Sequence, residues 1–118
     1  PSLSHMYALD YKLNKIMNIE KKENRFQRHK LLADITRDWA RDRYKLLVKD
    51  NNYSDTVTAV VNSRETDLKM LSSKLKDQGY VFSNGYGKLK DKTFRIAHMA
   101  DTTIEELKAY LETIDKLI

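Results

Sequence analysis

The 118-residue sequence contains no cysteine, one proline and three glycines. Without cysteine there can be no disulfide framework, no thiolate-bound iron–sulfur cluster and no thiolate zinc site. Scarce glycine and proline exclude collagen-like and low-complexity chains. Apolar runs are only a few residues long and no charged-then-apolar leader is visible, so we expect a cytoplasmic protein that does not enter a membrane.

What is present indicates one folded domain over residues 1–118. Hydrophobic residues make up 41% of the chain and charged residues 33%. This apolar content is enough to form a core, and the length fits a single domain.

The net charge of +5 is localised. Residues 21–45 hold nine Lys or Arg and four Asp or Glu, whereas the rest of the chain carries thirteen of each sign. A basic stripe on one helix can bind nucleic acid. Because acids are interspersed here, the pattern favours a solvated helix face with i,i+4 ion pairs, and we expect no nucleic-acid partner.

Two N-terminal helices are predicted over residues 6–18 and 23–43. In the first, Leu9, Leu13 and Ile16 recur at the spacing of one helical face. The second has a narrow apolar stripe, with Trp39 as its expected core anchor, and this stripe runs through Arg28, Leu32, Ile35 and Trp39.

The period then changes from that of helices to that of strands. Residues 56–61 are mostly β-branched and alternate, which predicts a strand buried on at least one face. A short apolar stretch at 45–48 precedes a turn predicted at 50–52. Further strands are predicted over 80–83 and 93–98.

A third helix is predicted from about residue 64 to residue 78. Asn62 and Ser63 are suitable N-caps, and Gly79 suits the position just after the C-terminus. Leu68, Leu71 and Leu75 recur within it at helical spacing.

The last helix is predicted over residues 102–118, where Thr102 and Glu105 have the spacing of a capping box. The order of elements predicts an α+β fold. Its sheet would have three or four antiparallel or mixed strands, with the helices packed on one face, after two N-terminal helices.

The strand predicted over residues 93–98 carries one candidate binding residue. Alternation places Phe94 and Ile96 on the core face and Arg95 on the opposite face. A guanidinium held on a strand can bind a carboxylate with two parallel hydrogen bonds. An exposed sheet arginine with an ion-pair partner has the same pattern, so spacing alone leaves both interpretations open.

Other candidate sites are weaker. His5, His29 and His98 lack the spacing of metal ligands, so we predict no metal site, and His98 is expected to be hydrogen-bonded at the edge of the core. The loop at residues 84–88 is not followed by the Ser/Thr and helix of a P-loop, which excludes that mode of nucleotide binding.

Four segments resemble class V aminotransferases, the pyridoxal-phosphate enzymes of the alanine–glyoxylate and serine–pyruvate type. The most specific is Gly85 to Met99, GYGKLKDKTFRIAHM. Residues 1–9 resemble the segment that opens the small domain of the family, residues 23–29 the following helix start, and residues 54–60 the central strand of that domain. The resemblance therefore implies the aminotransferase small domain, which is C-terminal in the family.

Two residues acquire roles from the resemblance. Arg95 matches the arginine that binds the substrate carboxylate, and Tyr7 resembles the tyrosine whose hydroxyl reaches the cofactor phosphate of the neighbouring subunit. The sequence departs from the family at Ala97 and Ala100, where glycine is common, and at Lys21–Lys22, which replaces a glycine–apolar pair.

The resemblance also implies missing parts. In the family, the lysine that binds pyridoxal phosphate lies in a large domain that precedes this one, so we expect a fragment or an isolated domain that is inactive, contains no catalytic residue and binds no cofactor alone. The implied partners are that large domain, a second subunit in a homodimer, and a small amino acid with a keto acid. The alternatives are a basic α+β module that binds nucleic acid or another protein.

Overall fold

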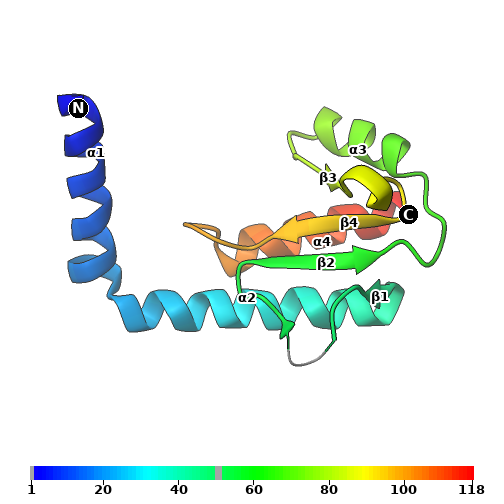
Figure 1. The fold of residues 1–118 in the computed structure, drawn as a ribbon, viewed down its shortest axis with the longest axis horizontal. Helices are drawn as coiled ribbons and strands as arrows, with labels where there is room; N and C mark the ends of the chain where they lie inside the picture. Colours follow the sequence, from blue (N-terminus) through cyan, green and yellow to red (C-terminus); the bar gives the residue numbers. More distant parts are fainter. Residues whose placement is uncertain (1, 50–51) are drawn as a thin grey trace.

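The computed structural model describes residues 2–49 and 52–118 (Figure 1). Asp50 and Asn51 of the predicted turn lie outside the described residues. In chain order the elements are α1 (Leu3–Asn14), the π-helical segment η1 (Lys15–Glu20), α2 (Lys22–Arg43), β1 (Lys45–Leu46), β2 (Val57–Val61), α3 (Leu68–Asp77), β3 (Ser83–Asn84), the 3₁₀ segment η3 (Gly87–Leu89), β4 (Thr93–Ala97) and α4 (Ile104–Leu117).

The four strands form one antiparallel sheet in the order β1-β2-β4-β3. Val60, Phe94 and Ile96 are almost completely buried and share one core cluster with residues of α2, α3 and α4. The predicted α+β class, with helices packed against one face of a four-stranded sheet, is therefore confirmed. None of the described helices is both long and apolar enough to cross a membrane.

Helix α2 contributes the predicted anchor. Trp39 is 6% exposed, and its indole N–H donates to Oδ1 of Asp115 on α4 at 2.9 Å. Its ring also lies next to Tyr44, which packs edge-on against Phe94 with the ring centroids 5.2 Å apart. This aromatic row joins α2 to the central strands.

Helix α3 begins four residues later than predicted, so the proposed caps at Asn62 and Ser63 were wrong. Asp67 is the N-cap and accepts a hydrogen bond from the Met70 N–H. Asn62 instead bonds to both the N–H and the carbonyl of Thr66, which closes a turn ahead of the helix.

The end of α3 agrees with the sequence, but the next strand does not. Gly79 has φ +86°, and the N–H groups of Gly79 and Tyr80 donate to the carbonyls of Lys76 and Leu75, which is a Schellman motif. The strand predicted at 80–83 is reduced to Ser83 and Asn84 because the chain is still leaving the helix at Tyr80.

Helix α4 is capped by Thr103, whose hydroxyl accepts from the Glu106 N–H at 3.1 Å. The predicted Thr102–Glu105 box was wrong by one residue. The helix itself is confirmed, and Leu107, Leu111 and Ile114 bury its apolar face.

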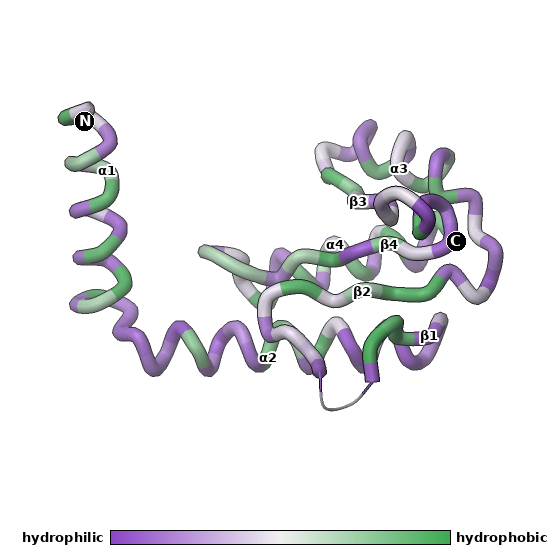
Figure 2. The backbone as a smooth tube through the Cα atoms, in the orientation of Figure 1, coloured by the Kyte–Doolittle hydropathy of each residue, from purple (hydrophilic) through white to green (hydrophobic). Residues whose placement is uncertain are grey.

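Helix α1 projects from the far end of α2, away from the sheet (Figure 1). None of its residues is buried, and the predicted stripe of Leu9 and Leu13 is 60% and 50% exposed. Apolar residues nevertheless recur along it (Figure 2). The helix therefore has an apolar surface that the other described residues do not cover.

Backbone strain is found at two of the positions where this sequence lacks the glycine that is common in class V aminotransferases. Lys21 has φ 69° and ψ 143° at the bend between η1 and α2, and Ala100 has φ 60°. A side chain at positive φ costs on the order of 1–3 kcal/mol when the region is one that glycine alone occupies freely.

We expect Lys21→Gly to raise the free energy of unfolding by roughly 1 kcal/mol, since relief of strain outweighs the added entropy of glycine in the unfolded chain. Urea denaturation measures this change. Lys22→Gly, at the first residue of α2, is the matched control and should not raise stability. A fall in stability with Lys21→Gly would contradict the prediction.

Candidate functional site

Arg95 lies in the middle of β4, between Ala59 of β2 and Ser83 of β3. Its side chain is exposed on the face opposite Phe94 and Ile96, as alternation predicts. The directly paired neighbours are small, so a ligand has access to the guanidinium.

Arg95 differs from the other six arginines in its surroundings. Among the described residues it has no carboxylate within 4 Å, and its one hydrogen bond runs from Nη2 to the carbonyl of Asn84 at 3.5 Å. Arg64 lies over the ring of Tyr44. The five others form ion pairs with acidic side chains and are Arg25, Arg28, Arg37, Arg41 and Arg43. The guanidinium of Arg95 is thus free to bind an external anion.

Ion pairs within the basic stretch at residues 21–45 test the predicted solvated helix face. Arg37 and Arg41 pair with Asp34 and Asp38 at i,i+3 spacing rather than the predicted i,i+4. These contacts are typical of a solvated helix face. They support the expectation that this stretch does not bind nucleic acid, which remains a prediction.

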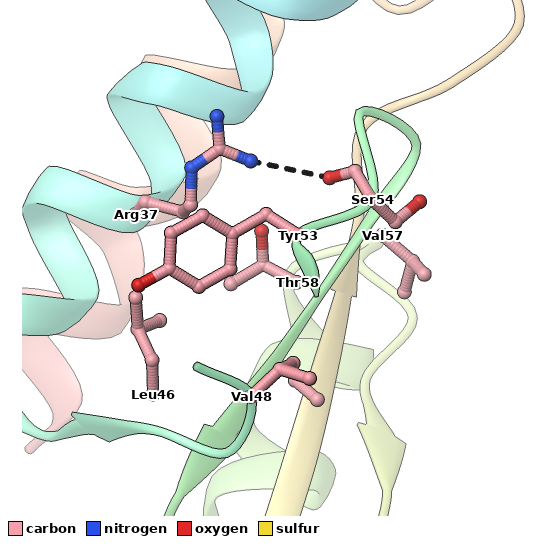
Figure 3. Close-up of a pocket in the computed structure, with 8 residues that line it drawn as sticks. Arg37, Leu46, Val48, Tyr53, Ser54, Val57 and Thr58 are labelled. Carbon is pink, nitrogen blue, oxygen red and sulfur yellow. Dashed lines mark hydrogen bonds between the residues drawn. The ribbon is translucent and has the colours of Figure 1, made fainter. Parts of the chain in front are cut away.

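A small cavity between α2 and the β1–β2 connection is lined by Arg37, but it is too small to hold a ligand. Arg37 donates to the Ser54 carbonyl at 3.2 Å and lies 4.8 Å from the ring centre of Tyr53 (Figure 3). The cavity volume is about 10 Å³, which is room for about one water molecule. Arg37 therefore anchors the connection between β1 and β2.

His98 is fully buried, and both of its ring nitrogens have partners. Nδ1 donates to the Asp55 carbonyl at 3.1 Å, so Nε2 accepts from the Thr58 hydroxyl at 2.8 Å. Burial lowers the pKa of His98. The predicted role as a hydrogen-bonded histidine of the core is confirmed, and no three described His, Asp or Glu residues could hold a metal ion together.

Tyr7 lies on α1 and is 73% exposed. It belongs to the projecting helix, whereas Arg95 lies in the sheet (Figure 1). The described structure does not bring the two predicted site residues together.

A polar cluster that the sequence did not indicate joins the bend before α2 to the loop after β4. Glu20 accepts from Arg25 at 3.1 Å and from Arg28 at 2.8 Å. Arg28 also donates to the carbonyls of Ala100 and Thr102 at 2.6 and 2.7 Å. Together with Lys12 and Asp101, these residues form a group that we call the bend cluster.

Asp101 ties the same loop to α1. Its carboxylate accepts from Lys12 at 2.7 Å and from Arg25 at 3.3 Å. The hydrogen bond from Lys12, followed by that from Arg25, holds the pKa of Asp101 well below its usual range. The hydrogen bond from Arg28 likewise lowers the pKa of Glu20, against the opposing effect of burial. Both carboxylates thus act in their charged form.

Because these pKa values are lower in the folded state, the bend cluster stabilises the structure fully above the ordinary carboxyl pKa. This contribution is lost as pH falls through the folded-state values. We expect the orientation of α1 to become progressively more heterogeneous as the pH falls from about 4 towards the lowered folded-state pKa values of Glu20 and Asp101. Since the chain has no cysteine, spin labels at Ser4→Cys and Ser73→Cys would report a distance distribution that is narrow at pH 7 and broad at low pH.

Asp101→Asn should broaden the same distribution already at pH 7. Glu112→Gln, which removes an exposed acid of α4 outside the cluster, should leave it unchanged. A distribution that stays narrow in Asp101→Asn would show that the cluster does not fix α1.

The described residues do not fit pyridoxal phosphate as a complete site. Covalent binding of its aldehyde calls for a lysine amine activated by desolvation or a neighbouring charge. None of the fifteen lysines is buried, and only Lys15 is half-buried. A cofactor site would therefore need residues outside this chain.

No family model matches the chain, and no curated protein matches it. Solved structures do. Alanine–glyoxylate aminotransferase from Nostoc sp. aligns over 94% of this chain with a TM-score of 0.85 and 23% identity. Pyridoxamine–pyruvate aminotransferase from Mesorhizobium loti aligns over 99% with a TM-score of 0.82 and 30% identity. Ureidoglycine–glyoxylate aminotransferase from Bacillus subtilis aligns over 83% with a TM-score of 0.75 and 22% identity.

These alignments cover only 30%, 31% and 26% of the three enzymes. The chain thus spans less than a third of the length of the structures it matches, and the match extends over nearly all of its own elements. The resemblance drawn from the sequence is confirmed: the chain has the fold of the C-terminal small domain of class V aminotransferases.

Proposed function

We propose that this chain is the C-terminal domain of a pyridoxal-phosphate-dependent aminotransferase. The complete enzyme would move an amino group between a small amino acid and a 2-keto acid such as glyoxylate or pyruvate. Arg95 would bind the substrate carboxylate. When bound, pyridoxal phosphate supplies the electron sink for this chemistry.

The observation that carries the proposal is the free guanidinium of Arg95 on a fold shared with three aminotransferases. An arginine without a carboxylate partner, flanked by small residues on a strand, is suited to bidentate carboxylate binding. Glyoxylate and pyruvate are the keto acids in the names of these similar aminotransferases. The two acids share the carboxylate that Arg95 would bind.

The exposed apolar surface of α1 and η1 supports the proposal that the complete enzyme has a large domain and a second subunit. Leu3, Met6 and Leu9 are each more than half exposed, and Met17 and Ile19 continue the apolar surface into η1. Apolar surface on this scale marks an interaction site. We propose that a large domain and a second subunit cover it, and that Tyr7 reaches a cofactor phosphate of that subunit.

The chain alone should not bind pyridoxal phosphate at a defined lysine. Titration with the cofactor should leave the visible absorption of the free aldehyde unchanged, because no lysine amine is desolvated. Borohydride reduction and peptide mapping should find at most scattered labelling of surface lysines. Trapping of the cofactor on one defined lysine would contradict the prediction.

The proposal itself is tested on the complete polypeptide. The coding sequence upstream of Pro1 should encode a large domain with a lysine that binds the cofactor, and the product should transaminate a small amino acid with glyoxylate or pyruvate. An upstream region without such a domain, or an inactive product loaded with cofactor, would overturn it.

A further inference from the structure

The side chain of Arg95 needs an external support to be held in one conformation. An exposed arginine loses substantial rotamer entropy when it is ordered. Its only hydrogen bond within the described residues is the 3.5 Å contact between Nη2 and the main-chain oxygen of Asn84. That oxygen is therefore the one polar group of the described residues that can hold the guanidinium in place.

The strand that carries this oxygen is short and lies at the edge of the sheet. β3 consists of Ser83 and Asn84 and pairs only with β4. Two residues of edge strand provide few ladder hydrogen bonds. One further bond extends the pairing, from the Gly85 N–H to the Thr93 carbonyl at 2.8 Å, so the position of Asn84 also depends on contacts outside the strands.

The side chain of Asn84 supplies this support with three hydrogen bonds. Oδ1 accepts from the N–H groups of Gly85 at 2.6 Å and Asp91 at 2.9 Å. Nδ2 donates to Oδ1 of Asp91 at 2.8 Å. The bonds to Asp91 close the loop between β3 and β4 across seven residues.

The loop is also held from its other side. Asn62 donates from Nδ2 to the Asp91 carbonyl at 3.1 Å, and its N–H donates to the Lys92 carbonyl at 2.8 Å. A Cβ atom at Gly85 would clash with the Leu89 carbonyl oxygen, so the loop is closely packed. The loop to which Asn84 is bonded is thus itself fixed by hydrogen bonds from Asn62.

We propose that Asn84 is a positioning residue for Arg95. Its side chain locks the edge strand to Asp91, and its main-chain oxygen then holds the guanidinium where a substrate carboxylate would meet it. This inference rests on the carboxylate-binding role proposed for Arg95.

Three variants separate this role from general support of the fold. Asn84→Ala removes all three side-chain bonds. The exchange Asn84→Asp with Asp91→Asn restores them, because the amide introduced at position 91 can donate to the carboxylate introduced at position 84. Asp91→Asn alone keeps an acceptor for Asn84 and suits the positive φ of 63° at residue 91.

The first measurement is the ¹⁵N relaxation of the Arg95 Nε–H group in the 118-residue chain, with Arg64 as the internal reference. We expect the order parameter of Arg95 to fall in Asn84→Ala and to recover in the exchange variant. Asp91→Asn should behave like wild type. An unchanged Arg95 order parameter in folded Asn84→Ala would overturn the proposal.

If Asn84→Ala does not fold, the exchange variant decides. An ordered Arg95 in the exchange variant supports the pairing of residues 84 and 91, and a disordered Arg95 in a folded exchange variant overturns it. Failure of the exchange variant to fold would also overturn it, since the restored bonds would then not be sufficient.

The second measurement is kinetic, on the complete polypeptide. Asn84→Ala should raise KM for the amino acid about 3- to 10-fold, with a much smaller change in kcat. This is the range expected for loss of the one hydrogen bond between Arg95 and the Asn84 carbonyl. A wild-type polypeptide without aminotransferase activity would refute the proposed function, and the relaxation data would still decide the role of Asn84. An unchanged KM in an active enzyme would overturn the positioning role alone.

Discussion

Arg95→Ala in the complete polypeptide should raise KM for the amino acid by roughly 30- to several-thousand-fold. This range corresponds to about 2–5 kcal/mol for a carboxylate left unpaired in a partly desolvated site. Arg95→Lys keeps the charge but loses the planar fork, so its effect should be smaller. The measurements are KM, cofactor occupancy and melting temperature on the same preparations.

Cofactor occupancy and melting temperature should hardly change in Arg95→Ala. The side chain is exposed and forms no ion pair with the described residues, so its removal leaves no buried group without a partner. Arg64→Ala is the matched control, since it removes one exposed positive charge elsewhere and should leave KM unchanged. A collapse of the melting temperature with an unaffected KM would show that Arg95 is a structural arginine of the sheet.

Much of the fold could be predicted because its long elements obey their own periodicity. The alternation in residues 93–98 placed Phe94 inside and Arg95 outside, and the helical stripes predicted α2 and α4 within a few residues of their ends. Such patterns reflect burial on one face, which is a local property of the sequence.

The errors arise where distant contacts override local signals. Asn62 resembles a helix N-cap, but in the structure it bonds to Thr66 and to Asp91, which lies 29 residues away. The stripe on α1 shows a related limit of local patterns, because the other described residues leave Leu9 and Leu13 exposed. Periodicity shows that a surface is apolar but not which partner buries it.

The candidate site could be predicted in part, because some of its features are local properties of the sequence and others are not. The exposure of Arg95 follows from alternation, whereas its lack of a carboxylate partner depends on where every acid of the chain lies. The bend cluster could not be predicted, since it depends on Asp101 meeting Arg25 across 76 residues of sequence. Asn84–Gly85 indicated a loop, but the bonds of Asn84 to Asp91 required coordinates.

Phe94, the residue before Arg95, should show the opposite behaviour when it is changed. Its side chain is fully buried and contacts the rings of Tyr44 and Phe82, with centroids 5.2 and 5.4 Å away. Phe94→Ala should lower the free energy of unfolding by about 3–5 kcal/mol, because it leaves a cavity at the centre of the core. For a domain of this size the melting temperature should fall by roughly 10 °C or more.

Denaturant titration and calorimetry of the 118-residue chain measure this loss, with Val81→Ala as the control. Val81 is 86% exposed, so its truncation should change stability by no more than about 0.5 kcal/mol. In the complete polypeptide, Phe94→Ala should reduce the amount of folded enzyme, while the KM of the folded fraction should stay within a few-fold of wild type. If Phe94→Ala instead raised KM as strongly as Arg95→Ala while stability was retained, the assignment of the two faces of β4 to core and substrate would be wrong.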